Sequence, residues 1–274
     1  MVTKTKGKIG VFDSGFGGLA ILKEIVKELP SYDFIYLGDS ARAPYGGRGE
    51  KTIYNFTKKG VEFLFREGAS LVILACNTAS SEALRKIQAD LKKDKVTDKN
   101  VLGVVIPGAE EAASKTKTGA IGVLATEATV RSKAFEREIK KIFPSAKVIQ
   151  KKAPLLVPLI EAGEDKSQSA NLLTEKYVKS VLQKKVDTLI LGCTHYGLIE
   201  NMIKKYTAGV TVISEGKIVA KKLAGYLKRH SEYRALLSQG GKREFFTTDD
   251  SADFDLHGSR FYGKKIKSKK VSLD

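Results

Sequence analysis

Only two of the 274 residues are cysteines, so a disulfide framework cannot hold this chain together. In a reducing compartment both side chains should remain thiols. The sequence also lacks a run of about 18 apolar residues, and it lacks a charged-then-apolar leader that ends in small residues. We therefore predict neither a membrane span nor a signal peptide, and we expect a cytoplasmic protein.

Signals for metal and nucleic-acid binding are weak. The three histidines, His195, His230 and His257, show no ligand spacing, so we predict no metal site. The formal charge of +17 favours an acidic partner, although a generally basic proteome would also explain it. The lysines are scattered, without zinc-finger spacing or an aromatic sheet motif. We expect an acidic metabolite as the partner and no nucleic acid.

Both cysteines lie in the same local pattern. Residues 71–80 read Leu-Val-Ile-Leu-Ala-Cys-Asn-Thr-Ala-Ser, and residues 188–195 read Thr-Leu-Ile-Leu-Gly-Cys-Thr-His. Each copy is an apolar run as long as a buried strand, followed by a small residue, cysteine and a short polar pair. An isolated cysteine is usually a small buried hydrophobe. Two cysteines at matched strand ends favour a functional role instead.

A second pair of similar segments precedes the cysteines. Residues 8–14 read Lys-Ile-Gly-Val-Phe-Asp-Ser, and residues 120–126 read Ala-Ile-Gly-Val-Leu-Ala-Thr. Ser14 lies 62 positions before Cys76, and Thr126 lies 67 positions before Cys193. Two similar segments in the same order and at nearly the same separation predict two structurally similar halves.

Apolar strands alternate with amphipathic helices along the chain, which predicts an α/β fold with mainly parallel, helix-covered sheets. We expect two pseudo-symmetric domains that face a central cleft: residues 1–106 with 216–274, and residues 107–215. The last strand of the first half is predicted at residues 101–106, with the crossing between halves at Pro107-Gly108. Ligands of such sheets bind beyond the carboxyl ends of the strands, where Asp13, Ser14 and both cysteines are expected.

Two thiols on opposite sides of a ligand suit one kind of chemistry. Inverting a carbon stereocentre by proton transfer requires a base on one face and an acid on the other. A thiolate and a thiol can exchange these roles, because nearby cations and helix N-termini bring the thiol pKa within reach of neutral pH. Asp13 and His195 are candidates to move the proton. The polar groups of Ser14, Asn77, Thr78 and Thr194 could hold a carboxylate.

Four ordered motifs resemble those of the cofactor-independent glutamate racemases, within the aspartate/glutamate racemase superfamily. They are Asp-Ser-Gly-x-Gly-Gly from Asp13, Gly-Asp-Ser-Ala-Arg-Ala-Pro-Tyr-Gly from Gly38, Ala-Cys-Asn-Thr-Ala from Ala75 and Leu-Gly-Cys-Thr-His-Tyr from Leu191. The resemblance implies an isomerase that interconverts L- and D-glutamate without a cofactor and supplies D-glutamate for peptidoglycan, and so for cell-wall biogenesis and cell shape. It also implies that the C-terminal segment returns to the first domain, and we expect a homodimer.

The same motifs imply the site residues. Cys76 and Cys193 match the acid/base thiols, and Glu161 resembles a supporting acid near the second thiol. A surface acid at a helix start would explain Glu161 almost as well. The positions that match substrate contacts are Asp13, Ser14, Tyr45, Gly46, Asn77, Thr78, Thr126, Thr129, Thr194 and His195.

Four positions, in three segments of the chain, depart from the family pattern. Gly197 stands where proline usually follows His-Tyr, Ser40 replaces a common threonine, and Ser214-Glu215 replaces a common Asp-Ser pair. Two alternatives stay open. One is a racemase of aspartate or another amino acid, which would share the thiols and differ in the pocket. The other is a non-catalytic binding protein for an acidic metabolite, for which paired cysteines would be unnecessary.

Overall fold

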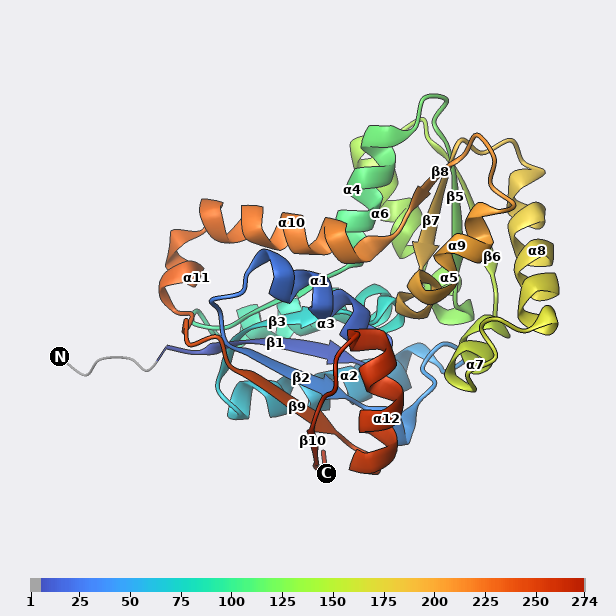
Figure 1. The fold of residues 1–274 in the computed structure, drawn as a ribbon. Helices are drawn as coiled ribbons and strands as arrows, with labels where there is room; N and C mark the ends of the chain where they lie inside the picture. The colour runs from blue at the N-terminus through green and yellow to red at the C-terminus, as the bar shows by residue number, and fades with distance from the viewer. Residues whose placement is uncertain (1–5, 274) are drawn as a thin grey trace.

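The computed structural model describes residues 6–273 and shows two α/β lobes, each built on a parallel sheet (Figure 1). The first sheet has the strand order β10-β9-β2-β1-β3-β4. Its strands are β1 (Lys8–Asp13), β2 (Phe34–Gly38), β3 (Ala69–Leu74), β4 (Asn100–Gly103), β9 (Arg243–Thr247) and β10 (Ser268–Lys270). The second sheet has the order β6-β5-β7-β8. Its strands are β5 (Ala120–Ala125), β6 (Lys147–Lys152), β7 (Thr188–Gly192) and β8 (Thr211–Ile213).

Four strands of the first sheet, in the order β2-β1-β3-β4, have the same topology as the second sheet. In the first, β1 pairs with β2 and β3, and β3 pairs with β4. In the second, β5 pairs with β6 and β7, and β7 pairs with β8. The similar segments of the sequence therefore occupy equivalent strands: β1 corresponds to β5, and β3 to β7. The predicted fold class, two similar α/β halves with parallel sheets, is confirmed.

Helices cover both faces of each sheet. Those of the first lobe are α1 (Gly18–Glu28), η1 (Ser40–Arg42), α2 (Glu50–Arg66), α3 (Asn77–Lys93), α10 (Glu215–Arg229), α11 (Ser231–Ala235) and α12 (Ser251–Tyr262). Those of the second are α4 (Val105–Lys115), α5 (Glu127–Ser132), α6 (Ala134–Ile142), α7 (Leu156–Glu161), α8 (Gln168–Leu182), η2 (Thr194–Ile199) and α9 (Glu200–Lys204). None of these helices combines the length and apolar character that a membrane span needs.

The apolar runs become strands because both faces of each strand are buried. Successive side chains of β3 alternate between two cores: Leu71 and Ile73 pack in the cluster that holds the apolar residues of α1, and Val72 and Leu74 pack in the cluster that holds those of α2 and α3. This two-sided burial makes the run before Cys76 continuous rather than alternating. The carboxyl end of β3 lies at the edge of the sheet that faces the second lobe (Figure 1).

The C-terminal segment returns to the first sheet, where β9 pairs with β2 and β10 with β9. The connection is α10, which packs along α1 and reaches α4 of the second lobe (Figure 1). The domain boundaries at residues 106/107 and 215/216 remain predictions, and the predicted ends at residues 1–5 and 274 lie outside the described residues.

The predicted strand at residues 101–106 is wrong at its carboxyl end. β4 stops at Gly103, and helix α4 begins at Val105, so Pro107-Gly108 lies within the first turns of a helix. The crossing between the halves at this point stays a prediction. Proline is tolerated near the start of a helix because the N–H groups there have no partner in the helix. Val104 and Val105 are apolar, β-branched and buried at this helix start, and such a run in the sequence is typical of a strand.

Candidate active site

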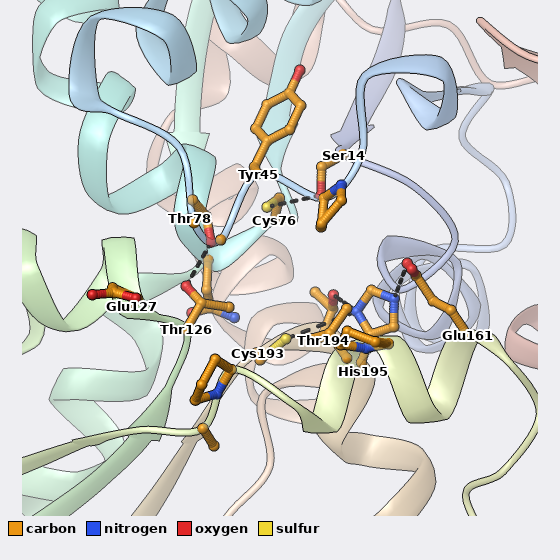
Figure 2. Close-up of a pocket in the computed structure, with 18 residues that line it drawn as sticks. Ser14, Tyr45, Cys76, Thr78, Thr126, Glu127, Glu161, Cys193, Thr194 and His195 are labelled. Atoms are coloured by element: carbon orange, nitrogen blue, oxygen red, sulfur yellow. Dashed lines mark hydrogen bonds and ion pairs between the residues drawn. The ribbon is translucent and has the colours of Figure 1, made fainter.

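The carboxyl ends of both sheets face one cavity of about 210 Å³. Figure 2 shows Cys76 with Ser14 on one side of this pocket and Cys193 with Thr194 and His195 on the other. Eleven of the thirteen residues expected from the sequence line it: Ser14, Tyr45, Gly46, Cys76, Asn77, Thr78, Thr126, Glu161, Cys193, Thr194 and His195. Asp13 and Thr129, each fully buried, lie behind this lining.

Cys76 lies between β3 and α3 and caps the helix. Its Sγ accepts a hydrogen bond from the Ala79 N–H at 3.5 Å, and the Ser14 hydroxyl lies 3.4 Å from the same sulfur. Burial raises the pKa of the Cys76 thiol to about 12, and the charge of Asp13 adds to this, against the opposing effect of the bonds from Ser14 and Ala79. Cys76 is therefore a thiol at neutral pH.

Asp13 ends β1 directly behind the pocket. Its Oδ2 accepts a hydrogen bond from the Gly15 N–H at 3.0 Å, whereas its Oδ1 has no hydrogen-bond partner among residues 6–273. Burial raises the pKa of Asp13 above its usual range, although the charge of His195 and the N–H groups of Gly18 and Gly15 act against this. A buried carboxyl with a raised pKa and a free oxygen can hold a proton near Cys76.

On the opposite side, Cys193, His195 and Glu161 form a chain of contacts. The Nδ1 atom of His195 lies 3.8 Å from Cys193 Sγ, and its Nε2 atom lies 3.0 Å from Glu161 Oε1. Burial lowers the pKa of His195, but the hydrogen bonds to Cys193 and Glu161 outweigh it and raise that pKa to about 10. His195 is thus an imidazolium at neutral pH, and a cation beside Cys193 stabilises a thiolate there.

Glu161 lies at the carboxyl end of α7, and its side chain contacts His195. The sequence left open whether Glu161 is a supporting acid or a surface residue at a helix start. It is the last residue of α7, not the first, and its side chain is only 25% exposed. Phe261 of α12 packs edge-on against the His195 ring, with 5.3 Å between ring centroids. These contacts define the orientation of the imidazole.

Threonine hydroxyls join the two lobes across the pocket. The Oγ1 atoms of Thr78 and Thr126 are 2.9 Å apart, and Thr129 Oγ1 lies 3.0 Å from Thr126 Oγ1. Thr126 also caps α5 by accepting the Thr129 N–H, so its position is set by a helix start. The loop at Gly46 packs on the same threonine: a Cβ at Gly46 would lie 2.9 Å from Thr126 Cβ. Only glycine allows this approach.

Tyr45 points its ring away from the pocket (Figure 2). Its hydroxyl donates a hydrogen bond to the buried carboxylate of Asp39, which also accepts from Arg42 and from the Thr248 hydroxyl. Tyr45 therefore anchors the loop that follows β2. A ligand in the pocket would contact the backbone of Tyr45 rather than its hydroxyl group.

Seven further residues line the pocket that sequence reasoning did not identify: Pro44, Gly47, Glu127, Ala153, Pro154, Val157 and Pro158. Ala153 and Pro154 directly follow β6, which ends at Lys152. Ligands of such sheets bind beyond the carboxyl ends of the strands, so Ala153 and Pro154 could be predicted as pocket residues once the end of β6 is known. Val157 and Glu161 are one helical turn apart, a signal that required α7 to be recognised as a helix.

The described residues contain no group of three or more His, Cys, Asp or Glu side chains that could hold a metal ion. The pocket instead combines the thiols of Cys76 and Cys193, the ionisable groups of Asp13 and His195 beside them, and a row of hydroxyl groups. This set can transfer protons to and from a small polar ligand from two directions.

Comparisons with known proteins agree with this geometry. The family model described as Asp/Glu/hydantoin racemase matches residues 9–223. A glutamate racemase of Geobacter metallireducens is 39% identical over 94% of this chain and 93% of its own length. The structure is similar to a glutamate racemase of Bacillus anthracis, with a TM-score of 0.89 and 32% identity over 97% of this chain and 98% of the other. It is also similar to a glutamate racemase of Francisella tularensis solved with D-glutamate, with a TM-score of 0.87 and 32% identity over 98% of both chains.

Proposed function

This chain belongs to the Asp/Glu/hydantoin racemase family, and we propose that it is a glutamate racemase, a cofactor-independent isomerase that interconverts L- and D-glutamate. The observation that carries the proposal is the placement of Cys76 and Cys193 on opposite sides of one pocket (Figure 2). The substrate α-carbon can then lose its proton to one thiolate, and the planar carbanion that results can gain a proton from the other thiol on the opposite face. The names of the similar proteins support glutamate as the substrate.

A racemase runs in both directions, so each thiol acts as the base for one enantiomer and as the acid for the other. Cys76 carries its proton, while Cys193 lies beside the imidazolium of His195. In the L-to-D direction the Cys193 thiolate takes the α-proton and the Cys76 thiol delivers its own proton to the opposite face. The products are D-glutamate, a Cys193 thiol and a Cys76 thiolate. The assignment of Cys193 to the L-enantiomer and Cys76 to the D-enantiomer follows from the family resemblance.

The thiols must then exchange protons to begin another cycle. On one side His195 contacts Cys193 Sγ and Glu161, so it can pass a proton between the sulfur and the open edge of the pocket. On the other side Asp13, whose raised pKa lets it carry a proton and whose Oδ1 is free, can return a proton to the Cys76 thiolate. The two sides therefore use different relay groups, a histidine-carboxylate pair and a buried acid.

The α-proton of an amino acid is very weakly acidic, so the carbanion needs stabilisation. Helix α3 begins at Asn77, immediately after Cys76, and its first N–H groups and dipole favour an anion. The hydroxyls of Thr78 and Thr126 are adjacent to this helix start. We propose that this region holds the substrate α-carboxylate, and that Ser14, Tyr45, Gly46 and Thr194 complete the substrate contacts.

We further propose that the protein acts in the cytoplasm, because both cysteines are free and the mechanism needs them reduced. The family resemblance implies that the product supplies peptidoglycan synthesis. A homodimer remains a prediction.

The first experiment is polarimetry with L-glutamate and L-aspartate in separate arms, without added cofactor or metal. We expect loss of optical rotation with glutamate. Racemisation of aspartate alone would replace the substrate assignment, and no change with either amino acid would contradict the proposed activity.

The second experiment separates the roles of the thiols. In Cys76→Ser the serine hydroxyl is a far poorer base, so removal of the α-proton from D-glutamate should become rate-limiting. A large primary isotope effect is then expected with α-deuterated D-glutamate and a suppressed one with the L-enantiomer. Cys193→Ser is the matched control and should show the reverse pattern. Identical patterns in both variants would refute a mechanism with one thiol on each face.

A further inference from the structure

A buried carboxyl group outside the proposed mechanism touches the active site from behind. Glu215 is the first residue of α10, and it is only 4% exposed. Its Oε2 accepts a hydrogen bond from Asn77 Nδ2 at 2.7 Å. Asn77 directly follows Cys76 and lines the pocket, whereas Glu215 directly follows Ser214 at the end of the second sheet's last strand. The contact thus joins segments 138 residues apart.

Space for this carboxyl group is provided by a glycine. A Cβ at Gly108, in the first turns of α4, would lie 3.0 Å from Glu215 Oε1. That separation is shorter than nearly all real Cβ contacts, so a side chain at Gly108 would press on Glu215. The carboxyl group therefore occupies a fitted position between α4 and the start of α3.

The pair of Asn77 and Glu215 lies between two cavities. Asn77 lines the active-site pocket, and Glu215 lines a second cavity of about 510 Å³ between α1, η2 and α10. Cys193 and Thr194 line both cavities, so the partition between them includes a proposed catalytic thiol. A change at Glu215 can thus reach the pocket through Asn77.

The remaining oxygens of the pair indicate a protonated carboxyl group. Within residues 6–273, neither Asn77 Oδ1 nor Glu215 Oε1 has a hydrogen-bond partner. A carboxylate here would leave two buried acceptors unsatisfied, whereas a proton on Glu215 provides a donor. Burial raises the pKa of Glu215 to about 8, against the opposing effect of the Asn77 bond. The charged groups that share the second cavity with it are Lys23, Glu24, Glu111, Lys115, Glu200, Lys217 and Arg260.

We propose that Glu215 is a positioning residue: its carboxyl group fixes the orientation of the Asn77 amide in the pocket, next to Cys76. The carboxyl group of Glu215, in the segment that follows the last strand of the second sheet, thereby sets the orientation of Asn77, a pocket-lining side chain of the first lobe. The kinetic consequence rests on the proposed racemase function, but the orientation of Asn77 does not.

The kinetic test compares two substitutions. Glu215→Ala removes the partner of Asn77, and kcat/KM for glutamate at pH 7 should fall roughly three- to tenfold, the value of one hydrogen bond. Glu215→Gln can both accept from the Asn77 amide and donate to it, so it should retain most of the activity. Glu111→Gln, in the wall of the same cavity, is the matched control and should match the wild type. A normal rate in Glu215→Ala, or equal losses in the Ala and Gln variants, would overturn the proposal.

A double-mutant cycle separates positioning from general damage to the fold. If Glu215 acts through Asn77, adding Glu215→Ala to Asn77→Ala should lower kcat/KM little beyond the Asn77→Ala value. Additive losses would contradict the proposed route.

The last test does not depend on activity. The side-chain amide resonances of Asn77, assigned with Asn77→Ala, should shift with pH through about 8 in the wild type and stay constant in Glu215→Gln. The folded protein retains a proton that unfolded Glu215 releases near pH 4.5, so wild-type stability should fall relative to Glu215→Gln from about pH 4.5 to about pH 8. A pH-independent amide and a constant difference in Tm would refute the proposal. An inactive protein that shows both effects would refute only the racemase function.

Discussion

Gly17 provides a test of how closely the two lobes must approach. It precedes α1 with φ −58° and ψ −36°, a backbone conformation that alanine adopts without strain. A Cβ at this position would nevertheless lie 2.2 Å from Thr194 Oγ1 and 2.7 Å from His195 Nδ1. Gly17→Ala therefore adds one methyl group between the first lobe and the two residues that follow Cys193.

The magnitude follows from these distances. The contact with Thr194 must widen from 2.2 Å to at least 3.0 Å, because real Cβ atoms essentially never come closer. His195 cannot yield freely, since Glu161 and Cys193 hold its two ring nitrogens. Overpacking of this kind costs about 1–3 kcal/mol of stability. A displacement of about 1 Å at a catalytic group costs on the order of 100-fold in rate.

The assay is kcat for L- and D-glutamate together with thermal unfolding followed by circular dichroism. We expect kcat to fall by about 100-fold in both directions, with Tm lower by several degrees. Gly197→Ala is the matched control, because it adds the same methyl group in η2, where among residues 6–273 no atom beyond the adjoining residues and the helix's own backbone lies within 4 Å of the new Cβ. Wild-type kinetics in Gly17→Ala, or an equal loss in Gly197→Ala, would refute the reasoning.

Two further outcomes follow from the site. The raised pKa of His195 contributes stability that is complete below pH 6.5 and is lost as pH rises to about 10. Glu161→Gln removes one cause of the raised pKa. The Tm of this variant should therefore lie furthest below the wild-type Tm at pH values under 6.5, and the difference should be smaller at pH 10. A deficit that grows with pH would contradict the His195–Glu161 contact. EDTA and hydroxylamine should each leave the racemisation rate unchanged, because the proposed mechanism uses only side chains, and strong inhibition by either would contradict it.

Local patterns in the sequence by themselves determined much of this protein. The apolar runs before Cys76 and Cys193 became buried parallel strands because helices cover both faces of each sheet. Their repetition indicated two halves of equal topology, and the polar residues that follow them line one pocket. Each of these features depends on a few consecutive residues, so the pattern of apolar and polar residues in the sequence is enough to predict it.

Other features depended on tertiary contacts. The apolar run at Val104 and Val105 has the composition of a strand but begins α4. Only the fold brings Glu161 to His195 and Glu215 to Asn77. Each of these pairs joins side chains 34 or more positions apart. Such contacts are decided by how sheets and helices pack, because a side chain's partner across the fold leaves no mark on the residues beside it in the sequence.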